Sequence, residues 1–172
     1  MDERFRGLGV ALVTPFRSNG GIDYAGLEKL IEHQIIGGVD YVVSMGTTGE
    51  SVTLTKDEKK QLLATTVELV RNRVPVVLGV GGNDTAAVIE NLNGFEMDGV
   101  DGILSVSPYY NKPTQEGIYQ HFKAIAQASL RPIILYNVPG RTGSNMSADT
   151  TVRLAKDFSN VVAIKEASGN LD

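Results

Sequence analysis

Short apolar segments alternate with amphipathic helical segments along the whole chain, and this alternation limits the folds that the chain can adopt. The first residues of successive apolar segments lie about 31 positions apart, the spacing that a strand–helix–strand crossover needs. The sequence therefore predicts an α/β fold with a parallel sheet. The expected strands are Leu8–Val13, Val39–Val43, Pro75–Gly79, Val100–Leu104, Pro132–Tyr136 and Val161–Lys165.

Residues that suit helix N-caps precede the intervening segments. Thr55 and Glu58 have the spacing of a capping box, and Asp23 precedes the first helical segment. Asp84, Thr114 and Ser147 indicate three further starts. The helices expected after these three residues are Thr85–Met97, Gln115–Ala128 and Ala148–Lys156.

Two parallel architectures fit this pattern. A doubly wound sheet would be complete with the strands present, whereas a barrel needs eight strands and about 250 residues. Polar residues at the carboxyl ends of several strands favour the barrel. We therefore expect residues 1–172 to form a single domain, a parallel (β/α)8 TIM barrel of which this chain covers the first six strands. The C-terminal barrel units would then be absent from a truncated chain.

Composition excludes several classes of function. The formal net charge is −4 and no basic block is present, which argues against nucleic acid or an anionic membrane as a partner. The chain has no cysteine, and His33 and His121 lack a metal-ligand spacing, so neither a disulfide nor a metal site is expected. Because no signal peptide or membrane-spanning run is apparent, we expect a cytoplasmic protein.

The last expected strand delivers one lysine at its carboxyl end. Strict alternation places Lys165 on the same face as Val161 and Ala163. Apolar surroundings favour the neutral form of a lysine amine, and a neutral amine forms Schiff bases with carbonyl substrates. The alternative is a structural lysine whose ammonium group reaches water.

The second and third strands are followed by glycine-rich turns. Thr47 and Thr48 lie between two glycines, where the backbone can bind an anion and the hydroxyls can relay a proton. A plain Thr/Gly turn is the alternative. The loop Gly79–Gly82 lacks the third glycine of a dinucleotide fingerprint, so close backbone packing explains it better.

Aromatic and cationic side chains follow the fourth and fifth strands. The pair Tyr109 and Tyr110 could serve acid–base chemistry, an interface or packing. Tyr136 has the parity of the inward-facing residues of its strand, so its phenol is expected beside Lys165. Arg141 offers a planar group that suits a carboxylate, or is an exposed arginine in a mobile loop.

Read together, four motifs resemble the dihydrodipicolinate synthase family, which are pyruvate-dependent enzymes of the class I aldolase type. The motifs are Gly46–Ser51, Pro108–Pro113, Tyr136–Gly143 and Ile164–Gly169. The resemblance implies a lyase that condenses pyruvate with L-aspartate 4-semialdehyde in the diaminopimelate route to lysine. It also implies a (β/α)8 barrel, a homotetramer built from dimers, and no metal or organic cofactor.

The resemblance also implies roles for individual residues. Lys165 resembles the Schiff-base lysine and Tyr136 the acid–base group that serves the imine. Thr47 and Tyr110 resemble the rest of a hydroxyl relay, in which the tyrosine comes from a neighbouring subunit.

The two substrate carboxylates have matching residues. Thr48 and the adjacent N–H groups resemble the cradle for the pyruvate carboxylate, and Arg141 resembles the residue that recognises the semialdehyde. N-acetylneuraminate lyases share the lysine and the tyrosine, but they tend to lack counterparts of Thr48 and Arg141. The synthase is therefore favoured over the lyase, and a non-catalytic barrel fragment is the alternative from another class.

Lysine-inhibited members of this family bind the inhibitor at a subunit interface. The matching positions here are Ser51, Lys59, Asn83, Ala87 and Tyr109. Sensitive bacterial enzymes usually carry histidine at the position of Lys59 and glutamate at that of Ala87. A cationic inhibitor would meet Lys59 unfavourably, so we expect weak or absent inhibition by lysine.

Overall fold

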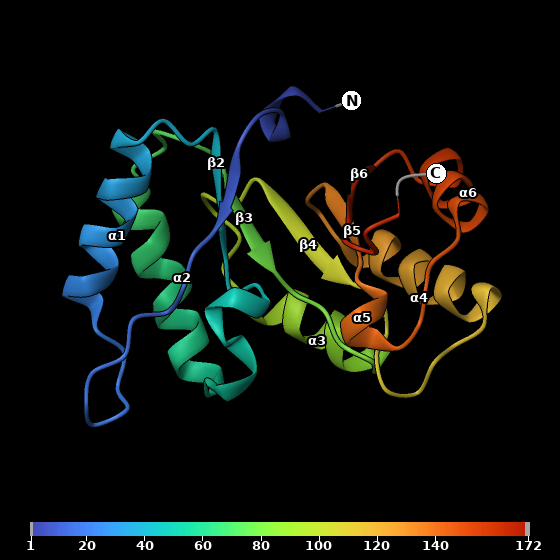
Figure 1. Ribbon diagram of the computed structural model, residues 1–172, viewed down its shortest axis with the longest axis horizontal. Coiled ribbons are helices and arrows are strands. Elements are labelled where there is room, and N and C mark those ends of the chain that lie inside the picture. Colours follow the sequence, from blue (N-terminus) through green and yellow to red (C-terminus); the bar gives the residue numbers. More distant parts are fainter. Residues whose placement is uncertain (1, 171–172) are drawn as a thin grey trace. The chain divides into compact units, whose positions relative to one another are not determined.

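A computed structural model describes residues 2–170, and all six expected strands form (Figure 1). The strands are β1 (Gly9–Ala11), β2 (Tyr41–Ser44), β3 (Val76–Gly79), β4 (Gly102–Val106), β5 (Ile133–Asn137) and β6 (Val161–Glu166). The α-helices are α1 (Tyr24–Ile36), α2 (Lys56–Val70), α3 (Thr85–Gly94), α4 (Gln115–Ala128), α5 (Pro139–Thr142) and α6 (Ala148–Asp157). Short 3-10 turns are η1 (Glu3–Phe5), η2 (Thr47–Gly49) and η3 (Ser51–Thr53).

The described chain forms two compact units. The N-terminal unit comprises residues 2–79 and 96–101 and contains β1–β3, α1 and α2. The C-terminal unit comprises residues 80–95 and 102–170 and contains β4–β6 and α3–α6. The expected single domain remains a prediction.

Parallel pairing is the rule inside each unit. In the N-terminal unit, β2 pairs with both β1 and β3. In the C-terminal unit, β5 lies between β4 and β6 in the same way. The central strand of the C-terminal unit, β5, is buried along its whole length, as expected for a parallel strand covered on both faces. The predicted α/β class with parallel strands is confirmed.

Helix starts follow the predicted caps. Thr55 and Glu58 form a full capping box, in which the Thr55 hydroxyl accepts from the Glu58 N–H and the Glu58 carboxylate accepts from the Thr55 N–H. Asp84 caps α3 by accepting from two N–H groups of its first turn. The predicted end of α3 at Met97 is wrong, because Phe95 already has an extended backbone and the helix ends at Gly94.

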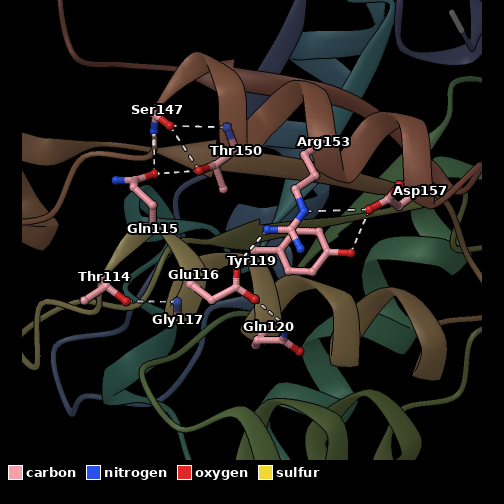
Figure 2. A network of polar contacts seen from close by, with 10 residues as sticks. All are labelled: Thr114, Gln115, Glu116, Gly117, Tyr119, Gln120, Ser147, Thr150, Arg153 and Asp157. Carbon is pink, nitrogen blue, oxygen red and sulfur yellow. Dashed lines mark hydrogen bonds and ion pairs between the residues drawn. The ribbon is translucent and has the colours of Figure 1, made fainter.

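Polar side chains join α4 to α6 in the C-terminal unit (Figure 2). The Gln115 side-chain oxygen accepts from the Ser147 N–H at 2.9 Å and from the Thr150 hydroxyl at 2.7 Å. Further along the same two helices, the Arg153 guanidinium lies 3.5 Å from the centre of the Tyr119 ring. These contacts fix α6, the helix that leads into β6.

The two histidines occupy opposite environments. His121, on α4, is buried, and its Nδ1 lies 2.8 Å from the Thr85 hydroxyl oxygen. Burial lowers the pKa of His121 to about 4, because the charged imidazolium would lose its hydration. His33 is exposed on α1. Between residues 2 and 170, no cluster of three or more His, Cys, Asp or Glu side chains could hold a metal ion.

Within residues 2–170, no helix is both long enough and apolar enough to cross a bilayer.

Candidate active site

Tyr136 and Lys165 lie opposite each other at the carboxyl ends of β5 and β6. They are paired residues in the parallel register of the two strands. The Lys165 Nζ lies 4.7 Å from the centre of the Tyr136 ring, a distance at which the ring face attracts a cation. Tyr136 is buried, so the phenol is held in place beside the amine. The structure therefore brings together the two residues that the sequence placed at the centre of the chemistry.

Two details of β6 differ from the expectation. Lys165 is exposed, not buried, because within the described residues β6 pairs only with β5. The register also shifts between Ile133 and Ile134, since Val161 pairs with Ile133 and Ala163 with Ile134. This irregularity interrupts the strict alternation predicted from Val161. Lys165 nevertheless ends opposite Tyr136.

A second polar pair lies one residue further along the same strands. Asn137 and Glu166 are also register partners, and the Asn137 amide nitrogen lies 2.9 Å and 3.1 Å from the two Glu166 carboxylate oxygens. Because strand residues alternate, this pair projects to the face opposite Tyr136 and Lys165. Sequence reasoning did not identify these two residues. The sequence signal that could have identified them is a polar residue directly after each candidate catalytic residue.

Arg141 and Tyr110 occupy neighbouring segments of the C-terminal unit. Arg141 is exposed on α5, a single helical turn with Pro139 at its start, where the sequence predicted a loop. Tyr110 is 88% exposed and has a positive φ of 71°, a conformation that is costly for a tyrosine. Its N–H donates to the Thr142 carbonyl at 3.3 Å, which ties this strained residue to the end of α5.

Thr47 and Thr48 belong to the N-terminal unit. Both are exposed and form the turn η2, which is closed by a hydrogen bond from the Gly49 N–H to the Gly46 carbonyl. The buried Thr14 hydroxyl donates to the Gly49 carbonyl at 2.6 Å and anchors this turn. Sequence reasoning did not identify Thr14, because its partner lies 35 residues away.

The glycines of the loop after β3 are explained by close packing, as predicted. A Cβ added to Gly79 would lie 2.4 Å from the Met45 carbonyl oxygen. One added to Gly81 would lie 2.7 Å from the Val106 nitrogen. Each side chain would therefore collide with a neighbouring backbone.

The family model described as "Dihydrodipicolinate synthetase family" matches residues 4–172. The chain belongs to this family.

Individual relatives agree with this assignment. The chain is 57% identical to the 4-hydroxy-tetrahydrodipicolinate synthase of Parabacteroides distasonis over 99% of its own length and 57% of that protein. It is 58% identical to the enzyme of the same name from Azobacteroides pseudotrichonymphae, over 97% of this chain and 56% of the relative. The chain thus spans a little over half the length of the curated relatives it matches.

A solved structure settles the choice between the two architectures. The chloride-inhibited dihydrodipicolinate synthase of Acinetobacter baumannii, described as complexed with pyruvate, matches with a TM-score of 0.92 and 48% identity. The match covers 96% of this chain and 56% of the Acinetobacter chain. The fold is the first six strands of a parallel (β/α)8 barrel, not a doubly wound sheet.

Five residues were expected, from the resemblance, to correspond to a lysine-binding site, and each is described within its own unit. Ser51 and Lys59 are half-buried residues of the N-terminal unit. Asn83, Ala87 and Tyr109 belong to the C-terminal unit. There the Asn83 carbonyl accepts from the Asn111 side chain at 3.2 Å, which holds the loop before α3.

Proposed function

We propose that the full-length protein is a lyase, a Schiff-base-forming synthase that condenses pyruvate with L-aspartate 4-semialdehyde to 4-hydroxy-tetrahydrodipicolinate. The observation that carries this proposal is the Lys165 amine held beside Tyr136 at the ends of two parallel strands. Membership of the family and the pyruvate complex of the Acinetobacter relative support it.

Lys165 supplies the nucleophile. The neutral amine attacks the ketone carbon of pyruvate, and loss of water leaves a protonated imine. The imine withdraws electrons, so the methyl group of pyruvate loses a proton and an enamine forms. The enamine carbon then attacks the aldehyde carbon of the second substrate and forms the new carbon–carbon bond. The Tyr136 phenol donates and accepts the protons that these steps require.

Thr47 and Tyr110 complete a relay of hydroxyl groups in this proposal. Hydroxyls suit the task because one hydroxyl can both donate and accept a proton. Tyr110 serves the site of a neighbouring subunit in a homotetramer built from dimers. Its high exposure and left-handed backbone support this role, since strain of this kind concentrates at functional positions.

Thr48 and Arg141 bind the two substrate carboxylates. Thr48 and the N–H groups of η2 receive the pyruvate carboxylate, and the Arg141 guanidinium receives that of the semialdehyde. Thr48 and Arg141 are both exposed, which supports their access to small molecules. The reaction needs no metal or organic cofactor and takes place in the cytoplasm.

Borohydride trapping tests the proposal. The full-length protein is incubated with pyruvate and reduced, and its peptides are analysed by mass spectrometry. A pyruvyl adduct on Lys165 is expected, and its absence would identify a non-catalytic barrel. Turnover with aspartate semialdehyde but not with N-acetylneuraminate then separates the synthase from the lyase.

Inhibition by lysine is proposed to be weak. Lys59 repels a cationic inhibitor and Ala87 offers no carboxylate to its ammonium group, while Ser51, Asn83 and Tyr109 remain able to contact it. A steady-state assay with added lysine measures this directly. Half-inhibition at micromolar lysine would contradict it.

A further inference from the structure

A buried asparagine joins three segments at the carboxyl end of β5. Asn137 is 1% exposed and directly follows Tyr136. Its side-chain oxygen accepts from the Met146 N–H at 3.0 Å, which fixes the orientation of the amide. The amide nitrogen then donates to the Asn145 side-chain oxygen at 2.7 Å and to the Glu166 carboxylate. Every polar atom of this buried side chain therefore has a partner.

The bond between Asn137 and Glu166 lies on the back of the candidate site. One residue earlier on each strand, Tyr136 and Lys165 form the pair on the front. The Ala167 N–H donates to the Asn137 carbonyl at 2.9 Å and extends the pairing past the end of β6. A slip of β6 by one residue would break this bond and turn Lys165 to the opposite face. The register of β6 is irregular at its start, so the hydrogen bond at its other end fixes the position of the strand relative to β5.

The Glu166 carboxylate is suited to stay ionised in this position. Burial raises its pKa, but hydrogen bonds from the Asn137 amide and from the Ser168 N–H outweigh that effect and lower the pKa below its ordinary value. The Ser168 N–H donates to the carboxylate at 2.7 Å. An ionised acceptor makes a stronger bond to the asparagine amide than a neutral one.

The same asparagine reaches the segment that follows Arg141. Asn145 and Met146 come shortly after α5, the turn that carries this arginine. The Asn145 carbonyl accepts from the Gln115 side chain at 2.7 Å. Figure 2 shows the other contacts of Gln115, to Ser147 and Thr150. The network therefore runs from α4 through Asn145 to the ends of both strands.

We propose that Asn137 and Glu166 are positioning residues that keep Lys165 opposite Tyr136 and hold the segment behind Arg141. Neither residue contacts the reacting atoms in this assignment; they act through the geometry of the strand ends. The inference rests on the proposed function, because it concerns the rate at which Lys165 forms the imine with pyruvate.

Three variants of the full-length protein test this role. Asn137→Asp removes the donor and places a second carboxylate against Glu166, whose charge repels it. The double variant Asn137→Asp/Glu166→Gln restores a donor and an acceptor with the partners exchanged. Asn160→Asp is the matched control, because the Asn160 amide donates to the Ala126 carbonyl at 2.9 Å just before the other end of β6. The measurement is the single-turnover rate of the Lys165 adduct at saturating pyruvate, trapped with borohydride.

Asn137→Asp is expected to slow imine formation between about 10-fold and about 100-fold, because a small displacement of a reacting group has an effect of this size. The double variant should recover to within about 3-fold of the unsubstituted protein, since the two substitutions compensate at one contact. Asn160→Asp should lower the midpoint of thermal unfolding but leave this rate unchanged.

The outcomes separate the two proposals. If the unsubstituted protein forms no adduct, the proposed function is wrong. If the unsubstituted protein forms the adduct, three results overturn the positioning role alone. These are an unchanged rate in Asn137→Asp, an equal loss in Asn160→Asp, and a double variant no faster than Asn137→Asp.

Discussion

The turn after β2 and the ends of β5 and β6 both present candidate site residues, but they are held in different ways. In the N-terminal unit, Met45 and Glu50 adopt positive φ angles of 57° and 51°, and main-chain bonds close η2 between them. One buried side chain, Thr14, anchors that turn. In the C-terminal unit, the strand ends depend on the side chains of Asn137 and Glu166.

The conformation of the turn after β2 is set by local sequence, whereas that of the ends of β5 and β6 is set by tertiary contacts. A turn closed by its own backbone and by glycine is specified by a short stretch of sequence. A side-chain pair between two strands exists only after both strands have found their register. We therefore expect the C-terminal unit to be the more sensitive of the two to single side-chain changes.

The largest effect is expected at Lys165. Lys165→Arg keeps a long basic side chain beside the Tyr136 ring but removes the amine that forms the imine, so it separates chemistry from packing. Adduct formation with pyruvate should fall by about a thousand-fold or more, because the nucleophile itself is lost. Lys156→Arg, an exposed change on α6, is the control and should leave the rate unchanged. A rapid adduct in Lys165→Arg would mean that another lysine is the nucleophile.

The interior of the C-terminal unit should also respond to pH. The pKa of His121 is lowered to about 4 by burial, against 6.5 for a free histidine. The unfolded chain therefore takes up a proton first as the pH falls, and the stabilising contribution is complete above 6.5 and lost toward 4. The free energy of unfolding should fall by about 3 kcal/mol from this group between about pH 7 and about pH 4.

Urea unfolding across this range measures the effect. Other groups titrate in the same interval, so the contribution of His121 is the difference between the unsubstituted protein and His121→Gln. His33→Gln changes an exposed histidine of α1 and should keep the original pH dependence. If the free energy of unfolding depends on pH equally in His121→Gln and in the unsubstituted protein, His121 is not buried in its neutral form.

A smaller effect is expected where one side chain supports the backbone-held turn. Thr14→Val removes the donor to the Gly49 carbonyl and leaves that buried oxygen without a partner. The free energy of unfolding should fall by about 2 kcal/mol. Thr53→Val is the matched control, because its hydroxyl donates to the Glu50 carbonyl at 2.9 Å in an exposed position, and it should cost less than about 0.5 kcal/mol. Equal losses of unfolding free energy in the two variants would show that burial does not decide the cost.

Much of the fold could be predicted from local patterns. Apolar runs identified every strand that the structure describes between residues 2 and 170, and the Thr55 capping box fixed the start of α2. The end of α3 was misjudged because Phe95 and Met97 continue its apolar pattern, although the chain has already turned to an extended conformation. Gly94, at which the helix ends, was the local stop signal, and the apolar pattern was given more weight than this glycine.

The part of the candidate site that lies at the ends of adjacent parallel strands could be predicted from the sequence. Tyr136 and Lys165 were placed together from the parity and order of parallel strands. Asn137 could not be found in this way, because its partners Asn145, Met146 and Glu166 gather only in the folded chain. The exposure of Lys165 was also unexpected, because it depends on which strands flank β6.

The smallest effect is expected in the network with the most contacts. In Figure 2, Arg153 stacks on the Tyr119 ring and pairs with Glu116 at 2.6 Å, while the Tyr119 hydroxyl donates to Asp157 at 2.7 Å. Arg153→Lys keeps the charge but loses the planar stacking. The midpoint of thermal unfolding should shift by less than about 1 °C, because water already solvates exposed ion pairs.

Comparing Arg153→Lys with Thr14→Val tests whether burial decides how much stability a polar contact contributes. Thr14 donates one hydrogen bond of 2.6 Å in the interior, whereas Arg153 makes several contacts at the surface. If burial decides the cost of losing a polar contact, Thr14→Val lowers stability far more than Arg153→Lys. A larger shift for Arg153→Lys, measured at low and at high salt, would instead mean that the link between α4 and α6 contributes as much as the interior anchor. The C-terminal unit would then be held by its surface side chains as well as by Asn137 and Glu166.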